Sequence, residues 1–151
     1  VKNVKKQKAS KEEVAEAIFV ATALKAGSAA AHGVNALNAY DGNSDEELYK
    51  ASYFNRIKEF SKLNDETFKA FLNFDHHSIK AENLSEKEKE LIAVACAHTT
   101  GCAYCINLHT KNAKNTGANL AEISEAIFVA VALKAGSAIA HSVNALNAFD
   151  E

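Results

Sequence analysis

The sequence predicts an all-α protein, and three observations support this fold class. The 151 residues include no proline, the residue that most strongly disrupts helix interiors. Long stretches are apolar on almost every side at helical spacing, as expected of helices buried against more than one neighbour. Four segments open with a Ser or Asn followed three residues later by Glu, the capping box typical of helix N-termini. These pairs are Ser10 with Glu13, Ser44 with Glu47, Ser85 with Glu88 and Asn119 with Glu122.

The caps and the glycines divide the chain into about eight expected helices. Gly27 and Gly136 are each followed by serine, and each is expected to break a long run into a helix pair. Gly101 is expected to end one helix just before Cys102. The resulting helices cover residues 11–26, 28–40, 45–61, 65–81, 85–99, 102–115, 120–134 and 137–149.

An internal repeat relates the two ends of the chain. Residues 2–41 match residues 111–150 at a constant offset of 109, with 27 identities in 40 positions. We therefore expect residues 1–42 to form a half-unit that repeats the last two helices, and residues 43–151 to form a complete unit. Because the chain contains no methionine, we also expect a longer tandem parent. One and a half copies are too few for a solenoid, which needs at least about three repeats.

A candidate redox motif lies in an uncharged run. Residues 91–110 contain no Asp, Glu, Lys or Arg, and Glu90 is the last charged residue before them. A helix that starts at Cys102 offers free backbone N–H groups that stabilise a thiolate. His109 follows Cys105 by one helical turn, so the two share a face and can exchange a proton. Glu90 belongs to the preceding helix, and a buried carboxylate there needs a partner.

Other interpretations of these cysteines remain open at this point. With His98, the motif forms a His-x3-Cys-x2-Cys-x3-His pattern that supplies four possible zinc ligands. Structural zinc sites usually bring two ligand pairs together across a longer segment, which counts against this interpretation. The thiols can also be purely structural, as we expect for Cys96 in the middle of an apolar helix.

The chain resembles the carboxymuconolactone decarboxylase and alkylhydroperoxidase D superfamily, over residues 43–151. The resemblance rests on residues 84–93, on residues 101–109 with their CxxC and CxxxH spacings, and on residues 125–141. It implies an alkylhydroperoxidase D-like helical bundle that assembles as a homo-oligomer, a trimer or a hexamer. Tyr104 stands where the best-known alkylhydroperoxidase D enzymes have a histidine, and it can either bind substrate or simply pack.

The same resemblance implies a mechanism. It makes Glu90, Cys102, Cys105 and His109 the catalytic residues. One cysteine attacks a hydroperoxide and becomes a sulfenic acid, the other resolves it as a disulfide, and Glu90 with His109 relays protons. Cys105 is favoured as the attacking residue because His109 lies within its reach on the helix.

The predicted activity is therefore that of a thiol-dependent peroxidase or disulfide oxidoreductase, with no cofactor and no metal. The expected substrate is a hydroperoxide or a disulfide, and the expected reductant is a thiol or a lipoyl-type group. Two alternatives stay open: a decarboxylase acting on a small lactone acid, and a zinc-binding or structural oligomer. The decarboxylase would need cationic or polar anchors that the uncharged run does not supply.

Composition limits the other partners. A net charge of −2 predicts no binding to nucleic acid. Lys134 and Gly136 interrupt the apolar stretch 126–140, which predicts no membrane span. Three cysteines, an odd number, fit a reducing compartment better than a disulfide framework, so we expect a cytoplasmic protein.

Overall fold

The described part of the chain is helical and contains no strand. The computed structural model describes residues 7–40 and 49–150. Within them lie α2 (Lys11–Tyr40), the 3-10 helix η1 (Ala51–Arg56), α3 (Ile57–Leu63), α4 (Asp65–Ile79), α5 (Glu86–Thr100), α6 (Ala103–Asn115) and α7 (Leu120–Asp150). The predicted all-α class is confirmed, but with six α-helices in these residues instead of about eight.

Two of the predicted helix breaks are wrong, because α2 and α7 are each continuous. Glycine in a helix interior costs only about 1 kcal/mol relative to alanine, which good helix formers on either side can offset. At Gly27 a Cβ would lie 3.4 Å from Cζ of Phe71, an ordinary van der Waals contact, so packing there does not require glycine. The expected helix 45–61 is also wrong in part: η1 and α3 take its place from Ala51 onward, and its Ser44–Glu47 cap lies outside the described residues.

Three helices begin at the predicted caps. At the start of α5 the Ser85 hydroxyl accepts from the N–H of Glu88 at 3.2 Å, and the Ser85 N–H donates to Glu88 Oε2 at 2.8 Å. Reciprocal bonds of the same kind join Ser10 with Glu13 and Asn119 with Glu122. These helix starts follow from local hydrogen bonding alone.

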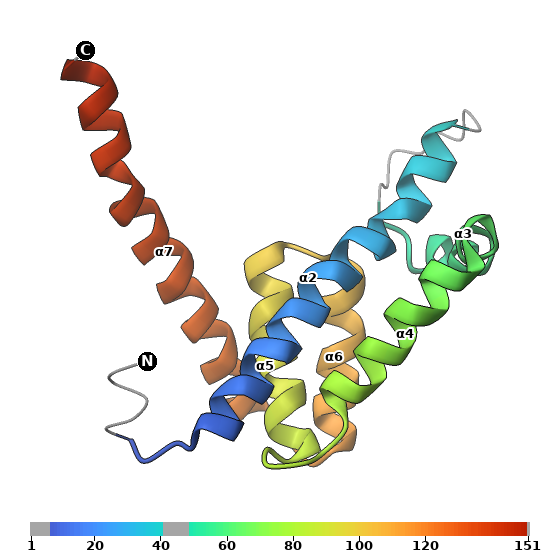
Figure 1. Cartoon of the computed structure of the whole chain (residues 1–151), viewed down its shortest axis with the longest axis horizontal. Helices are drawn as coiled ribbons and strands as arrows, with labels where there is room; N and C mark the ends of the chain where they lie inside the picture. The colour runs from blue at the N-terminus through green and yellow to red at the C-terminus, as the bar shows by residue number, and fades with distance from the viewer. Residues whose placement is uncertain (1–6, 41–48, 151) are drawn as a thin grey trace.

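Helix α5 is the centre of the fold. It packs against α2, α6 and α7, and α2 also lies against α4 and α6 (Figure 1). The main core forms where α2 meets α5 and the start of α6. Its buried members are Val20, Leu24, Ala31, Ala93, Ala97, Cys102, Tyr104 and Cys105. The cysteine pair is therefore part of the core.

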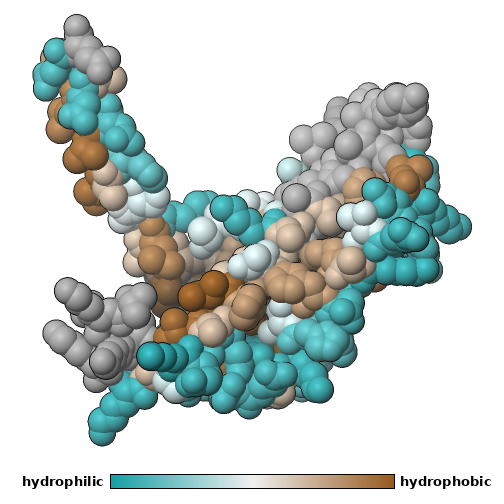
Figure 2. Space-filling model, in the orientation of Figure 1, coloured by the Kyte–Doolittle hydropathy of each residue, from teal (hydrophilic) through white to brown (hydrophobic). Residues whose placement is uncertain are grey.

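Helix α7 packs on the body through its first third, and beyond that the Lys134 side chain donates to the His98 carbonyl at 3.5 Å. Ile123 and Ala130 are buried against the body, whereas every residue from 131 to 150 is exposed. The rest of the helix leaves the body, and Figure 2 shows hydrophobic residues along its side. In the described chain α7 is the one helix whose length and composition would allow it to cross a membrane. This finding rests on length and composition only, so the expectation that residues 126–140 do not span a membrane stays a prediction.

Candidate functional site

The cysteine pair sits at the N-terminus of α6, as its position after a glycine predicts. Gly101 ends α5 in the left-handed conformation, with φ 74°, which costs glycine little. Cys102 is the N-cap of α6, and its Sγ accepts a hydrogen bond from the Cys105 N–H at 3.2 Å. Backbone N–H groups at a helix start favour negative charge, so the Cys102 sulfur lies in a place that stabilises a thiolate.

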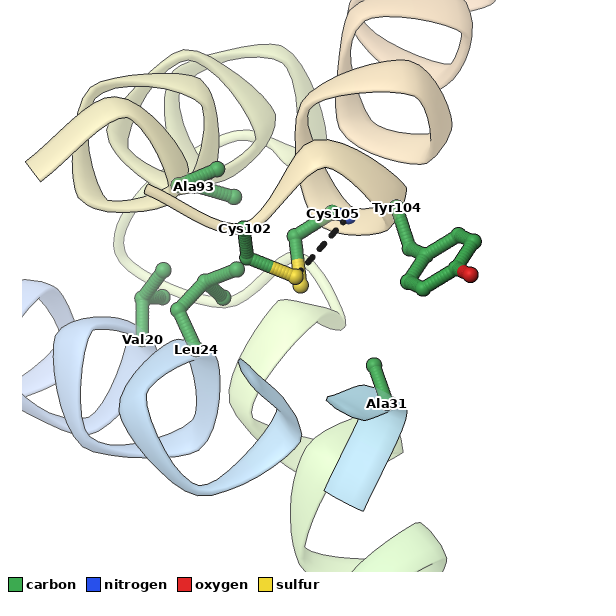
Figure 3. Close-up of a cluster of buried hydrophobic side chains, with 8 residues drawn as sticks. Val20, Leu24, Ala31, Ala93, Cys102, Tyr104 and Cys105 are labelled. Carbon is green, nitrogen blue, oxygen red and sulfur yellow. Dashed lines mark hydrogen bonds between the residues drawn. The ribbon is translucent and has the colours of Figure 1, made fainter. Parts of the chain in front are cut away.

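The two thiols have different surroundings. Cys102 is fully buried, whereas Cys105 borders a cavity. Figure 3 shows both sulfur atoms between α2 and the start of α6, close to Leu24. Hydrogen bonding with Cys102, together with burial, raises the pKa of the Cys105 thiol well above its ordinary value. Cys105 therefore needs a base to become a nucleophile.

The structure brings Glu90 and His109 together from α5 and α6. Nδ1 of His109 lies 2.8 Å from Oε2 of Glu90, and both side chains are buried. The other carboxylate oxygen accepts from Nδ2 of Asn112 at 3.1 Å. With the carboxylate as acceptor, Nδ1 carries the proton of a neutral ring and Nε2 is left as the basic nitrogen. Asn112 has no role in the sequence analysis, although it follows His109 by three residues on the same helix.

An apolar cavity of about 360 Å³ lies in front of Cys105. Helix α2, η1, α3, α4 and α6 all contribute to its wall, and both Cys105 and His109 line it. The other lining residues are Ala23, Leu24, Gly27, Ala30, Ala31, Phe54, Ile57, Phe68, Phe71, Leu72, Asp75, Tyr104 and Leu108. The wall thus places the thiol and the imidazole beside a largely hydrocarbon space.

Asp75 is a site residue that the sequence analysis missed. It lines the cavity with His109, and burial raises the pKa of its carboxyl group, with a further contribution from the charge of Glu90. Phe68, Phe71 and Asp75 recur every three or four residues along α4, so they share one helix face. That spacing marks one face of α4, but it does not say that the face meets the CxxC motif.

A buried ion pair fixes α2 over the site, and it too was not predicted. Nζ of Lys89 lies 2.9 Å from Oε2 of Glu16 and donates to the Lys80 carbonyl at 2.7 Å. The Glu16 carboxylate also accepts from the backbone N–H groups of Asn83 and Leu84. The hydrogen bond from Lys89 is the main reason why the pKa of Glu16 falls to about 2. Lys89 is next to Glu90 in α5, so the ion pair joins α2 to the helix that carries the relay carboxylate.

The remaining candidate residues have packing contacts. The ring of Tyr104 lies 5.3 Å from that of Phe54 and 6.0 Å from that of Tyr49, measured between centroids. Cys96 is half-buried beside the core, and burial raises the pKa of its thiol. Nδ1 of His98 donates to the Val94 carbonyl at 2.8 Å. Across residues 7–40 and 49–150, no three His, Cys, Asp or Glu side chains are grouped as metal ligands.

Comparison with known proteins places the motif inside a known family. The sequence profile of the carboxymuconolactone decarboxylase family matches residues 65–148. The chain belongs to this family. The matched region includes α4 to α6, nearly all of α7, and every residue of the Glu90, Cys102, Cys105 and His109 set.

One similar relative is a protein of Paracoccus denitrificans described as "Uncharacterized protein 4 in cox locus". It is 48% identical over 68 residues, which make up 45% of this chain and 61% of the relative. The chain thus covers about three fifths of that protein's length. No solved structure matches the chain.

Proposed function

We propose that this member of the carboxymuconolactone decarboxylase family is a thiol-dependent peroxidase that cycles its CxxC pair between dithiol and disulfide. The observation that carries the proposal is the cavity wall, where Cys105 and His109 face the same apolar space while Glu90 holds the imidazole from behind. Cys102, buried beside Cys105, supplies the second thiol.

The first step oxidises Cys105. Nε2 of His109 takes the thiol proton, and the thiolate attacks the outer oxygen of a hydroperoxide, ROOH. The O–O bond breaks, Cys105 becomes a sulfenic acid, and the alkoxide RO⁻ takes the proton from the imidazolium to leave as ROH. Glu90 stabilises the imidazolium because its carboxylate accepts the Nδ1 proton.

The second step forms the disulfide. The Cys102 sulfur attacks the sulfenic sulfur, an S–S bond forms, and the hydroxyl group leaves as water after taking the Cys102 proton. The N-terminal position of Cys102 favours its thiolate, which is the reactive form. A dithiol reductant, such as a lipoyl-type group, then returns both cysteines to thiols and leaves as its own disulfide.

The cavity favours apolar hydroperoxides over hydrogen peroxide. Its wall is mainly aliphatic and aromatic, and its ionisable side chains other than the thiol and phenol are Asp75 and His109. An alkyl or aryl group gains binding free energy in such a space, about 25 cal/mol for each Å² of apolar surface removed from water. An anionic lactone acid, the substrate of the alternative decarboxylase, would find no lysine or arginine in this wall.

The test is a single-turnover reaction of the reduced protein with one equivalent of cumene hydroperoxide, followed by peptide mass spectrometry. We expect rapid formation of a Cys102–Cys105 disulfide. Cys105→Ser should abolish peroxide consumption, whereas Cys102→Ser should consume one equivalent and leave a sulfenic acid that dimedone traps. Glu90→Gln should slow oxidation by about 10²-fold, within the range of general acid–base catalysis.

Glu86→Gln is the matched control, because this exposed residue lies on the same helix and faces solvent. It should leave the rate unchanged. Thiols that stay reduced in the wild-type chain would refute the peroxidase proposal. Equal loss of peroxide consumption in both cysteine variants would refute the assignment of Cys105 as the attacking residue.

A further inference from the structure

The exposed part of α7 repeats the helix that covers the cysteines. At the offset of 109, 22 of the 30 residues of α2 recur in α7. Leu24 of α2 is 2% exposed in the core, whereas its counterpart Leu133 is 62% exposed. The same contrast holds for two further pairs of equivalent residues, Ser28 with Ser137 and Ala31 with Ala140. In each pair the α2 residue is buried and the α7 residue is exposed.

The free side of α7 is turned away from the side that packs on α5. Successive residues of a helix turn by about 100°. Ile123, Ile127 and Ala130 lie on one side, toward α5. By the same geometry, Val129 and Leu133, together with positions 125, 136 and 140, centre roughly 125° around the helix axis from that side. We name this second set, residues 125, 129, 133, 136 and 140, the free face of α7. The helix can therefore hold α5 and present the free face at the same time.

Helix α2 uses the two sides in the reverse way. Its core-facing side carries Glu16, Val20 and Leu24, the equivalents of the free face. The other side of α2 corresponds to the side of α7 that packs on α5, but in α2 it faces solvent. Ile18, the counterpart of Ile127, is 58% exposed. One sequence therefore carries two packing surfaces, and each copy of it uses a different one.

The free face also repeats the polar anchor. Glu16 of α2 is held by Lys89 in the buried ion pair. Its counterpart Glu125 is exposed and makes no ion pair with the described residues. A carboxylate at this position of the repeat fits a lysine at the position of Lys89, and the apolar residues that follow it fit the surface beside Cys102 and Cys105.

We infer that α7 is a docking helix for the cysteine site of a second copy of this chain. Its free face takes the position that α2 occupies over α4, α5 and α6, with Glu125 on the partner copy's lysine and with Leu133, Gly136 and Ala140 in the cavity wall. The contact joins α7 of one copy to a different surface, the α2 position, of the next copy. Ile139 replaces Ala30 in the wall, so the cavity is narrower when α7 closes it.

The same residues argue for a protein surface over a lipid one. In α2 this face packs against protein side chains, and its glutamate pairs with a buried lysine. Within one chain α2 is tethered, and tethering gives it an effective concentration in roughly the millimolar range. Helix α7 of another copy therefore takes the position only when α2 leaves it. This inference concerns assembly and holds whether or not the site reduces peroxides.

The experiment weakens α2 docking in the full-length chain. Glu16→Lys with Leu24→Asp places a cation beside Lys89 and a carboxylate in the core, so α2 detaches. We expect sedimentation velocity to show association of this variant, and the addition of Glu125→Lys to reverse it. The same pair of α2 substitutions with Val131→Asp is the control, because Val131 is exposed on α7 outside the free face. It should still associate.

A photo-crosslinker at position 133 identifies the contact. Mixing ¹⁴N and ¹⁵N chains distinguishes crosslinks between copies from crosslinks within one copy. Crosslinks between copies should reach the partner's α5 and α6. We expect them in the variant with the two α2 substitutions and, at high protein concentration, in the otherwise unaltered chain. If Glu16→Lys/Leu24→Asp loses its fold, crosslinks in the otherwise unaltered chain decide the question. Crosslinks into the partner's α7, no crosslinks, or association that Glu125→Lys leaves intact would overturn the inference. So would binding to phosphatidylcholine/phosphatidylglycerol vesicles without contact between copies.

Discussion

The repeat offers a stability test in which one substitution is made twice in nearly the same sequence. Leu24→Ala and Leu133→Ala both change the leucine of an Ala-Leu-Lys-Ala-Gly-Ser segment inside a helix. Helix propensity therefore changes equally at the two positions. Only burial differs, because Leu24 is 2% exposed and Leu133 is 62% exposed.

The expected costs follow from this difference. Replacing leucine by alanine removes three carbon atoms, and at ~0.8 kcal/mol for each buried methylene the loss at Leu24 is about 2.4 kcal/mol. The cavity left behind raises the cost to about 3 kcal/mol, within the range of ~2–5 kcal/mol for buried leucines. At Leu133 about a third of that transfer free energy applies, which gives less than ~1 kcal/mol. The two variants should differ by about 2 kcal/mol.

Urea unfolding, followed by circular dichroism with a reductant present, measures both free energies of unfolding. The protein concentration must be low enough for each variant to sediment as a monomer, so that docking of α7 makes no contribution. Equal losses of stability under these conditions would refute the packing described for α2 and α7.

Three further predictions concern charge and cavity shape. Lys89 lowers the pKa of Glu16 from 4.5 to about 2, so this carboxylate stabilises the fold above pH 4.5 and loses that effect as pH falls toward 2. The stability advantage of the wild type over Glu16→Gln, measured by urea unfolding, should shrink across this range; a constant difference would contradict the ion pair. Burial raises the pKa of Asp75 above 3.8, so stability present below pH 3.8 is lost as pH rises and the group ionises. Asp75→Asn should therefore unfold at higher urea than the wild type at neutral pH but not below pH 3.8, and identical midpoints at both pH values would refute this. Ala30→Ile should narrow the cavity and slow cumene hydroperoxide reduction by about tenfold, the effect of ~1.4 kcal/mol, while hydrogen peroxide reacts as before; equal slowing of both substrates would show that position 30 does not select by size.

Short-range features of the site could be predicted from the sequence. The caps at Ser85 and Asn119 depend on residues three positions apart, so the local sequence specifies them. The position of Cys102 at a helix start likewise follows from Gly101 beside it. The proximity of Glu90 and His109 was expected from the family resemblance, which assigns both residues to one proton relay.

Features that depend on distant segments could not be predicted. Asp75 reaches the cavity from α4 and Glu16 reaches Lys89 from α2, and nothing near either residue in the sequence identifies its partner. The breaks expected at Gly27 and Gly136 were wrong for a related reason. Glycine favours a break only weakly, and the packing of Gly27 against Phe71 is visible only in the folded chain.

The repeat separates the properties that the local sequence determines from those that depend on tertiary packing. The sequence by itself determined that residues 11–40 and 120–149 are alike, helical and apolar on nearly all sides, because helix formation and side-chain periodicity depend on neighbouring residues. Only the tertiary structure decided that Leu24 covers the cysteines while Leu133 remains in solvent. The burial of a helix face depends on the elements that pack against it, and the two near-identical segments of this chain have different neighbours.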